Sequence, residues 1–243
     1  MMKTAAPRTS KPNLNHIETW VFDLDNTLYC ATTDLFSAID RRMGEFISDA
    51  LRVDSVEARH IQKTYFRDYG TTLRGLMVNH GTDPEAFLEY VHAIDVDVLK
   101  PDAALDSALA RLEGVKVVFT NGSADHAVKV MDRLGVTRHF DGVFDMAASG
   151  YLSKPDPAAY EALIARHRIR PAETVIFEDL TRNLAPAAEL GMTTVWVRNR
   201  THWSDTFVED GGKPDYVHHE TEDLTAWLEA AISARLAADQ GQR

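Results

Sequence analysis

Short apolar runs alternate with segments of helical periodicity along most of the chain. Four runs consist mainly of β-branched and aromatic residues, with at most one charge each, and span residues 20–22, 115–119, 174–177 and 193–197. Continuous apolar runs of this length between helical patterns are typical of buried parallel strands. The helical patterns that separate or follow them cover residues 103–112, 124–134, 157–167, 181–190 and 224–236. This alternation predicts an α/β fold with a parallel sheet.

Between the first two apolar runs the strand signal disappears. Apolar residues there recur at helical spacing, which predicts helices over residues 35–51, 56–69, 73–78 and 84–94. The last of these is opened by Asp83 as N-cap and by Pro84 in the first turn. We therefore predict three parts, which are a flexible N-terminal tail at residues 1–16, a core domain formed by residues 17–32 and 100–243, and an inserted helical domain at residues 33–99.

Composition and charge narrow the range of partners. The 243 residues are 44% hydrophobic, which is enough to bury a sizeable core. The formal charge of -11 disfavours a nucleic-acid polymer or an anionic membrane surface as partner. The single cysteine, Cys30, excludes an intramolecular disulfide, and no run approaches the roughly 20 apolar residues of a membrane span. Residues 1–16 contain no apolar signal segment, so we expect a soluble cytoplasmic protein.

Reactive side chains follow three of the predicted strands at the same end. The first strand runs into residues 23–27, with sequence Asp-Leu-Asp-Asn-Thr, the second into Thr120-Asn121-Gly122, and the third into Glu178-Asp179. In open α/β sheets, ligands bind at the carboxyl edge of the strands. The three segments together therefore predict one site at this edge.

The two carboxylates of Asp23 and Asp25 suggest a metal site joined to a nucleophile. In extended chain, side chains two residues apart leave on the same side, so one carboxylate must be protonated or a cation must lie between them. Asp23 can attack phosphorus to form an aspartyl phosphate. Mg2+ prefers oxygen ligands and few carboxylates, which Asp23, the backbone carbonyl of Asp25 and Asp179 can supply.

Further residues suit the chemistry of a phosphate monoester. If Asp25 binds the metal through its carbonyl, its carboxyl is free to protonate the leaving alkoxide and then to deprotonate water. The Thr120 hydroxyl and the backbone N–H groups around Gly122 suit a phosphate oxygen ahead of a helix. Lys154, between Ser153 and Pro155, supplies a positive charge that can align the phosphoryl group with the nucleophile.

These residues form four motifs, at residues 23–27, Thr120-Asn121-Gly122, Ser153-Lys154-Pro155 and Glu178-Asp179. In this order, the four motifs resemble the haloacid dehalogenase superfamily of phosphatases. The resemblance covers roughly residues 20–198 and implies a Rossmann-like core with a helical cap inserted after the first strand. It implies that Asp23 is the nucleophile and Asp25 the acid/base. Thr120 and Lys154 would bind phosphate and Asp179 the metal, with Glu178 either a direct ligand or next to one.

A narrower resemblance concerns the inserted segment. Residues 65–76 with the following His80 look like the pyrimidine 5'-nucleotidase branch, whose members dephosphorylate UMP and CMP. This resemblance makes Tyr69, Arg74 and His80 candidate substrate-binding residues, together with Tyr65 and Asn79. Asn121 and Gly122 of the second motif are also expected to bind substrate. The alternative for the inserted residues is ordinary packing and surface.

The leading interpretation is a Mg2+-dependent phosphomonoesterase that acts through an aspartyl phosphate, most specifically a pyrimidine 5'-nucleotidase. Its expected partner is a small phosphomonoester such as a nucleoside monophosphate. Alternatives are a phosphatase for phosphoglycolate or a sugar phosphate, a phosphomutase, a haloacid dehalogenase and a non-catalytic binding protein. A haloacid dehalogenase needs no metal, so Asp25 and Asp179 would have no role in such an enzyme. These two residues therefore argue against that reading. The sequence does not give the oligomeric state.

Overall fold

A computed structural model describes residues 14–199 and 213–241, so most of the predicted N-terminal tail lies outside the described residues. Six parallel strands form one sheet in the order β3-β2-β1-β4-β5-β6. Their bounds are β1 Thr19–Phe22, β2 Val115–Phe119, β3 Gly142–Phe144, β4 Thr174–Glu178, β5 Thr193–Val197 and β6 His219–Thr221. The four predicted strands are the central ones, and the two edge strands are three residues long.

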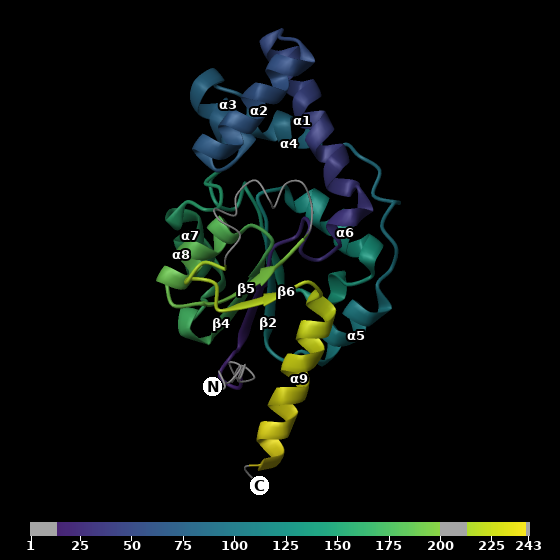
Figure 1. Ribbon diagram of the computed structural model, residues 1–243, viewed down its shortest axis with the longest axis vertical. Coiled ribbons are helices and arrows are strands. Elements are labelled where there is room, and N and C mark those ends of the chain that lie inside the picture. The colour runs from purple at the N-terminus through teal and green to yellow at the C-terminus, as the bar shows by residue number, and fades with distance from the viewer. Residues whose placement is uncertain (1–13, 200–212, 242–243) are drawn as a thin grey trace, which may run out of the picture.

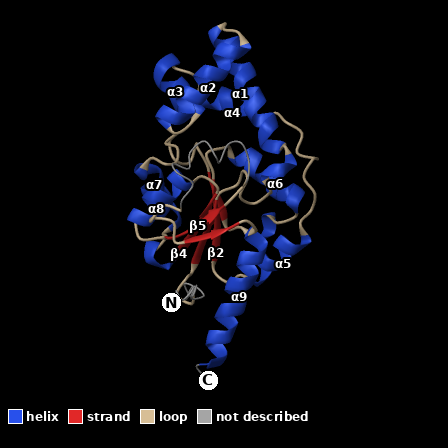
Figure 2. Ribbon diagram, in the orientation of Figure 1, coloured by secondary structure: helices blue, strands red, loops and turns tan. Residues whose placement is uncertain are grey.

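Alternating side chains of the strands pack on two layers of helices (Figures 1 and 2). Trp20 and Phe22 of β1 lie in a core with helices α5 (Ala103–Arg111), α6 (Ala124–Leu134) and α9 (Leu224–Gly241). Val21 points to the other face, which is covered by α7 (Pro157–His167) and α8 (Thr181–Glu189). This alternation follows from the two-residue period of a strand, and it explains why a sheet buried on both faces has continuous apolar strands.

The predicted insertion after β1 is helical and carries its own apolar core. Its helices are α1 Leu35–Leu51, α2 Ser55–Tyr69, α3 Thr72–His80 and α4 Pro84–Val91. The expected N-cap is present at Asp83, whose side chain accepts a hydrogen bond from the Glu85 backbone N–H. The four helices lie over the carboxyl edge of the sheet (Figure 1). This arrangement confirms the predicted α/β fold with an inserted helical cap. We refer to α1–α4 as the cap.

No helix within the described ranges is both long and apolar enough to span a lipid bilayer.

Substitution of two glycines in the cap helices, Gly75 and Gly44, tests how closely these helices pack. A Cβ on Gly75 would overlap Cβ and Cγ of Tyr65, which belong to the neighbouring helix α2. A Cβ on Gly44 would meet only the Gln62 side-chain oxygen, at an ordinary 3.7 Å. We predict that Gly75→Ala lowers the free energy of unfolding by about 1–3 kcal/mol, because α2 and α3 must separate.

Gly44→Ala should be neutral or stabilise the protein by up to about 1 kcal/mol, since alanine favours a helix interior. Urea unfolding of both variants measures the difference. Equal stability of the two variants would contradict the close packing of α2 on α3.

Candidate active site

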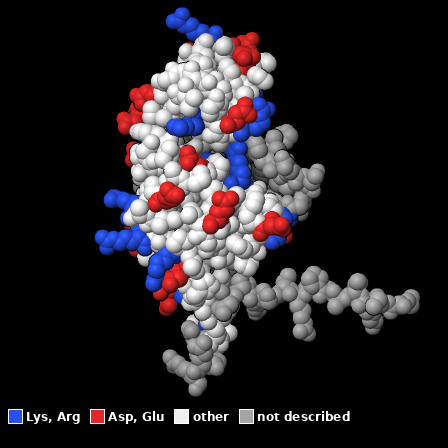
Figure 3. Space-filling model, turned by 90° about the vertical axis from the view of Figure 1, so that its left-hand side faces the viewer, with Lys and Arg blue, Asp and Glu red and all other residues white. Residues whose placement is uncertain are grey.

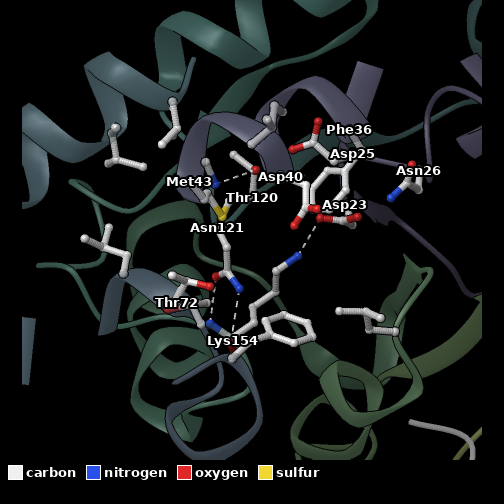
Figure 4. A pocket seen from close by; sticks show the side chains of 18 of the residues that line it. Asp23, Asp25, Asn26, Phe36, Asp40, Met43, Thr72, Thr120, Asn121 and Lys154 are labelled. Carbon is white, nitrogen blue, oxygen red and sulfur yellow. Dashed lines mark hydrogen bonds and ion pairs between the residues drawn. The ribbon is translucent and has the colours of Figure 1, made fainter. Parts of the chain in front are cut away.

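The three central strands bring the predicted motifs together at one edge of the sheet. Asp23 follows β1, Thr120 follows β2, and Asp179 follows Glu178, the last residue of β4. Because β2, β1 and β4 are neighbours in this order, the first residue after each strand projects at the same edge. Asp23 still takes part in the hydrogen bonding of the sheet, because its N–H donates to the Phe177 carbonyl at 2.9 Å. Figure 4 shows Asp23, Thr120 and Lys154 around one pocket.

Lys154 is the only lysine among the fully buried large side chains of the described chain, with 1% of its surface exposed. Its ammonium donates to Asp23 Oδ1 at 2.7 Å and to the Phe119 carbonyl at 2.8 Å, and it lies 2.9 Å from Glu178 Oε1. Burial by itself would lower the pKa of Lys154, but Asp23 and Glu178 raise it above its usual value. The lysine is therefore held as a cation between two carboxylates.

Asn121 fixes the loop that carries Lys154. The Asn121 amide donates to the Lys154 carbonyl at 3.1 Å, and the Lys154 N–H donates to the Asn121 side-chain oxygen at 2.8 Å. The peptide bond that follows, Lys154–Pro155, is cis. The predicted contact of Asn121 with substrate stays a prediction, because the amide is engaged in orienting the lysine.

Asp23, Glu178 and Asp179 form a buried acidic cluster whose carboxylate oxygens lie within 4.8 Å of one another. Burial and the negative charge of Glu178 raise the pKa of Asp23 to about 7, even with Lys154 beside it. Burial, with Glu178 and Asp23, also raises the pKa of Asp179 well above its usual value. One ammonium thus leaves the cluster short of positive charge, and a hard divalent cation such as Mg2+ fits these oxygen donors.

Glu178 is already engaged by donors from the protein. Besides Lys154, the Asn183 side-chain amide donates to Oε1 at 2.5 Å, and the Leu180 N–H donates to Oε2 at 3.0 Å. Asp23 and Asp179 are therefore the better-placed ligands for a metal. Direct ligation by Glu178 and by the backbone carbonyl of Asp25 stays a prediction.

The two aspartates of the first motif have different surroundings. The Thr27 hydroxyl donates to Asp23 Oδ2 at 2.9 Å, so both oxygens of Asp23 are held. Asp25 instead contacts Tyr29 and His126. Burial would raise the pKa of Asp25, but His126 and Tyr29 together lower it. Neither the tyrosine nor the histidine was among the predicted site residues, although Tyr29 lies only four residues after Asp25 in sequence.

The loop after β2 is shaped for a small anion. Gly122 donates its backbone N–H to the Thr120 hydroxyl at 2.9 Å, and α6 begins just afterwards with Ser123 as N-cap. A Cβ on Gly122 would lie 3.2 Å from Thr120 Oγ1 and 3.3 Å from the His92 ring. The absence of a side chain thus keeps the loop backbone open next to Thr120.

The same cavity extends from these residues into the cap. Its cap wall is mostly apolar and consists of Phe36, Ile39, Met43, Phe66, Leu73, Phe87, Leu88 and Val91. The polar cap residues on its lining are Asp40, Gln62, Lys63, Thr71, Thr72 and His92, which directly follows α4. Sequence reasoning missed this wall, because helical periodicity shows that a face is apolar but not which cavity it borders.

Three predicted substrate-binding residues lie elsewhere in the cap. Tyr69, Arg74 and His80 are not among the residues that line the cavity. His80 lies 2.7 Å from the Tyr65 hydroxyl, and the Tyr69 hydroxyl donates to Asn79 at 3.3 Å. These contacts are between half-exposed or exposed residues of α2 and α3, so binding of substrate by this group stays a prediction without support from the cavity.

Comparison with known proteins gives a family and several relatives. A model of haloacid dehalogenase-like hydrolases matches residues 17–191. The chain is 29% identical over 189 residues to Phosphate metabolism protein 8 of Saccharomyces cerevisiae, which covers 70% of this chain and 58% of the yeast protein. It is 28% identical over 217 residues to Glyceraldehyde 3-phosphate phosphatase of Methanocaldococcus jannaschii, which covers 84% of this chain and 93% of the archaeal protein.

Solved structures share the fold. A HAD phosphatase from Thermococcus onnurineus superposes with a TM-score of 0.57 at 19% identity, over 86% of this chain and 94% of the other. An L-2-haloacid dehalogenase from Xanthobacter autotrophicus superposes with a TM-score of 0.53 at 18% identity, over 91% and 98%. Because the fold is shared by a phosphatase and a dehalogenase, the reaction must be argued from the site.

The acidic cluster generates a prediction about metal and pH. At about pH 8, Mg2+ at roughly 100 times its dissociation constant should stabilise the fold by about 3 kcal/mol and raise Tm by roughly 5–10 °C. Since Asp23 has a pKa of about 7, protons compete with the metal below that value. The rise in Tm should therefore shrink as the pH falls toward about 5.

Thermal melts with and without Mg2+ measure this effect. Asp179→Asn should lose the rise at the higher pH. Asp106→Asn, which removes a partly exposed carboxylate paired with Arg138, should keep it. A rise of equal size at both pH values would show that the metal does not bind at this cluster.

Proposed function

We propose that this chain, which belongs to the haloacid dehalogenase-like hydrolase family, is a Mg2+-dependent phosphomonoesterase that works through an aspartyl phosphate on Asp23. One observation carries the proposal. Asp23 is buried at the carboxyl edge of the sheet, with a lysine ammonium at 2.7 Å and a cluster of carboxylates suited to a divalent cation beside it. A nucleophilic carboxylate can approach a phosphate dianion only where positive charge offsets their repulsion.

The proposed reaction has two displacements at phosphorus. In the first, a carboxylate oxygen of Asp23 forms a bond to phosphorus while the ester P–O bond breaks, and Asp25 gives its proton to the leaving alkoxide. In the second, Asp25 takes a proton from water as the water oxygen attacks phosphorus. The bond between phosphorus and Asp23 then breaks, which releases inorganic phosphate and restores both carboxyl groups.

The remaining residues hold charge and geometry in these steps. Lys154 keeps its positive charge beside Asp23 and offsets the charge of the phosphoryl group. Thr120 and the N–H groups of the following loop are the proposed ligands of phosphate oxygens. Mg2+, held by Asp23 and Asp179, would supply further positive charge at the phosphoryl group.

For the substrate, we propose a pyrimidine nucleoside monophosphate such as UMP or CMP. The wide apolar wall of the cap, with Phe36 and Phe66, suits a planar base, and Gln62 and Thr72 offer hydrogen-bonding groups. The alternative is a non-nucleotide small phosphate. The match to Glyceraldehyde 3-phosphate phosphatase over 93% of that protein favours this alternative.

The mechanism predicts that Asp23→Asn removes turnover but not the fold. The amide keeps nearly the same volume and cannot form the phosphoryl enzyme. Phosphate release from p-nitrophenyl phosphate should fall to background, and EDTA should have the same effect on the wild-type protein. Asp68→Asn, at an exposed cap carboxylate paired with Arg67, is the matched control and should keep full activity. Residual turnover by purified, folded Asp23→Asn would rule out the aspartyl phosphate.

A substrate panel tests the nucleotide proposal. UMP, CMP, AMP, glyceraldehyde 3-phosphate and phosphoglycolate are compared by kcat/KM under one Mg2+ concentration, and chloride release from 2-chloropropionate is measured beside them. We expect UMP and CMP to be preferred by at least about tenfold, which corresponds to about 1.4 kcal/mol of transition-state binding. Preference for a three-carbon phosphate would keep the mechanism and reject the nucleotide. Chloride release without phosphatase activity would reject both.

A further inference from the structure

Two hydrogen-bond donors converge on the same oxygen of Asp25. The Tyr29 hydroxyl donates to Oδ1 at 2.6 Å, and His126 Nε2 lies 3.0 Å from that oxygen. In the described part of the chain, Oδ2 has no hydrogen-bond partner. The Asp25 side chain is 15% exposed and lines the cavity, whereas the His126 side chain is fully buried. One oxygen of the carboxyl is thus anchored, and the other is left for a ligand.

The arrangement of His126 is not explained by stability. Because Asp25 Oδ1 accepts from Nε2, the hydrogen of a neutral ring lies on Nε2 and Nδ1 is an acceptor. His126 Nδ1 is buried and has no hydrogen-bond partner among the described residues. Leaving a buried polar atom unpaired costs about 1–3 kcal/mol. A fold selected for stability alone would satisfy this atom or replace the ring, so the ring is better explained by what it does to Asp25.

The cap supplies the residue that holds His126 in place. The ring of His92, at the end of α4, stacks on His126 with centroids 4.3 Å apart and planes 6° apart. His92 Nδ1 also lies 2.9 Å from the Ser123 hydroxyl, the N-cap of the helix that carries His126. Ser123 Oγ in turn accepts from the His126 backbone N–H at 3.3 Å. The imidazole of His126 is therefore fixed both by its own helix and by the cap.

We propose that His126 and Tyr29 are positioning residues for the general acid Asp25, and that His92 of the cap supports His126. The proposal rests on the phosphomonoesterase function proposed above. Two donors on Oδ1 leave Oδ2 as the oxygen that can carry the proton. Proton transfer to the leaving alkoxide then starts from one fixed atom. Without the donors, the carboxyl group can rotate and place its proton on the wrong oxygen.

The leaving group separates this role from a merely structural one. An alkoxide needs a proton to depart, whereas p-nitrophenolate is stable enough to leave without one. The ratio of kcat/KM for an alkyl phosphate, such as glycerol 2-phosphate, to kcat/KM for p-nitrophenyl phosphate therefore reports on Asp25. We expect His126→Leu to lower this ratio roughly 10- to 100-fold, which is part of the roughly 100- to 10,000-fold that general acid catalysis contributes. Tyr29→Phe, which removes one hydroxyl, should lower the ratio less.

Three further variants sharpen the test. His126→Gln, whose amide can donate to Asp25, should restore part of the ratio. His139→Leu is the matched control for His126→Leu, since it breaks a His–carboxylate pair with Asp106 away from the cavity and should leave the ratio unchanged. In an Asp25→Asn background, His126→Leu and Tyr29→Phe should have no additional effect on the ratio, because residues acting through one group are not additive.

The outcomes distinguish the inference from the function on which it rests. If the wild-type protein hydrolyses neither substrate, the proposed function fails. If Asp25→Asn changes the ratio but His126→Leu and Tyr29→Phe lower kcat/KM equally for both substrates, the proposed function stands and the positioning role is wrong. Circular dichroism establishes folding of each variant. If His126→Leu does not fold, Tyr29→Phe alone decides, because it retains the ring and removes only the hydrogen bond.

Discussion

The buried ion pair of Lys154 with Asp23 and Glu178 is the interaction on which the rest of the site depends. Removing an ammonium and two carboxylates from water is costly, and their mutual attraction repays that cost only where every group is well paired. Here the pairing requires the carboxyl ends of β1 and β4, the Phe119 carbonyl at the end of β2, and a loop held by Asn121. Apolar residues of similar volume would serve stability as well, so the cluster is a functional feature with a structural cost.

The environments of Asp23 and Asp25 push their pKa values in opposite directions. Burial and Glu178 raise the pKa of Asp23 to about 7, whereas His126 and Tyr29 lower that of Asp25 against the effect of burial. The proposed nucleophilic attack needs the reverse, with Asp23 ionised and Asp25 protonated. A divalent cation beside Asp23 lowers its pKa, and the negative charge of an arriving phosphate raises that of Asp25. Binding of metal and of substrate would thus each shift one of the two groups toward the protonation state that the proposed reaction needs.

The sequence was informative where topology alone decides the outcome. Parallel strands end at a common edge, so Asp23, Thr120 and Asp179 converge whatever the details of packing. The strands β3 and β6 gave no signal because three residues are too few for a pattern. The contact of Asp25 with His126 was equally hidden. His126 lies 101 positions from Asp25, and its orientation depends on stacking with a histidine of the cap, which no local spacing encodes.

The contacts between cap and core fall on the loops that carry the chemistry. Met146, after β3, is buried in the apolar core of the cap. Arg182, three residues after Asp179, donates to the carbonyls of Phe66 and Gly70 at 3.1 and 2.8 Å. His92, at the end of α4, contacts Ser123 in the loop after β2. Because the cap rests on the segments that follow three strands of the sheet, a change in its position must be transmitted to the groups at the sheet edge. The apolar wall proposed to contact the leaving group and the residues proposed to activate it are therefore joined by direct contacts.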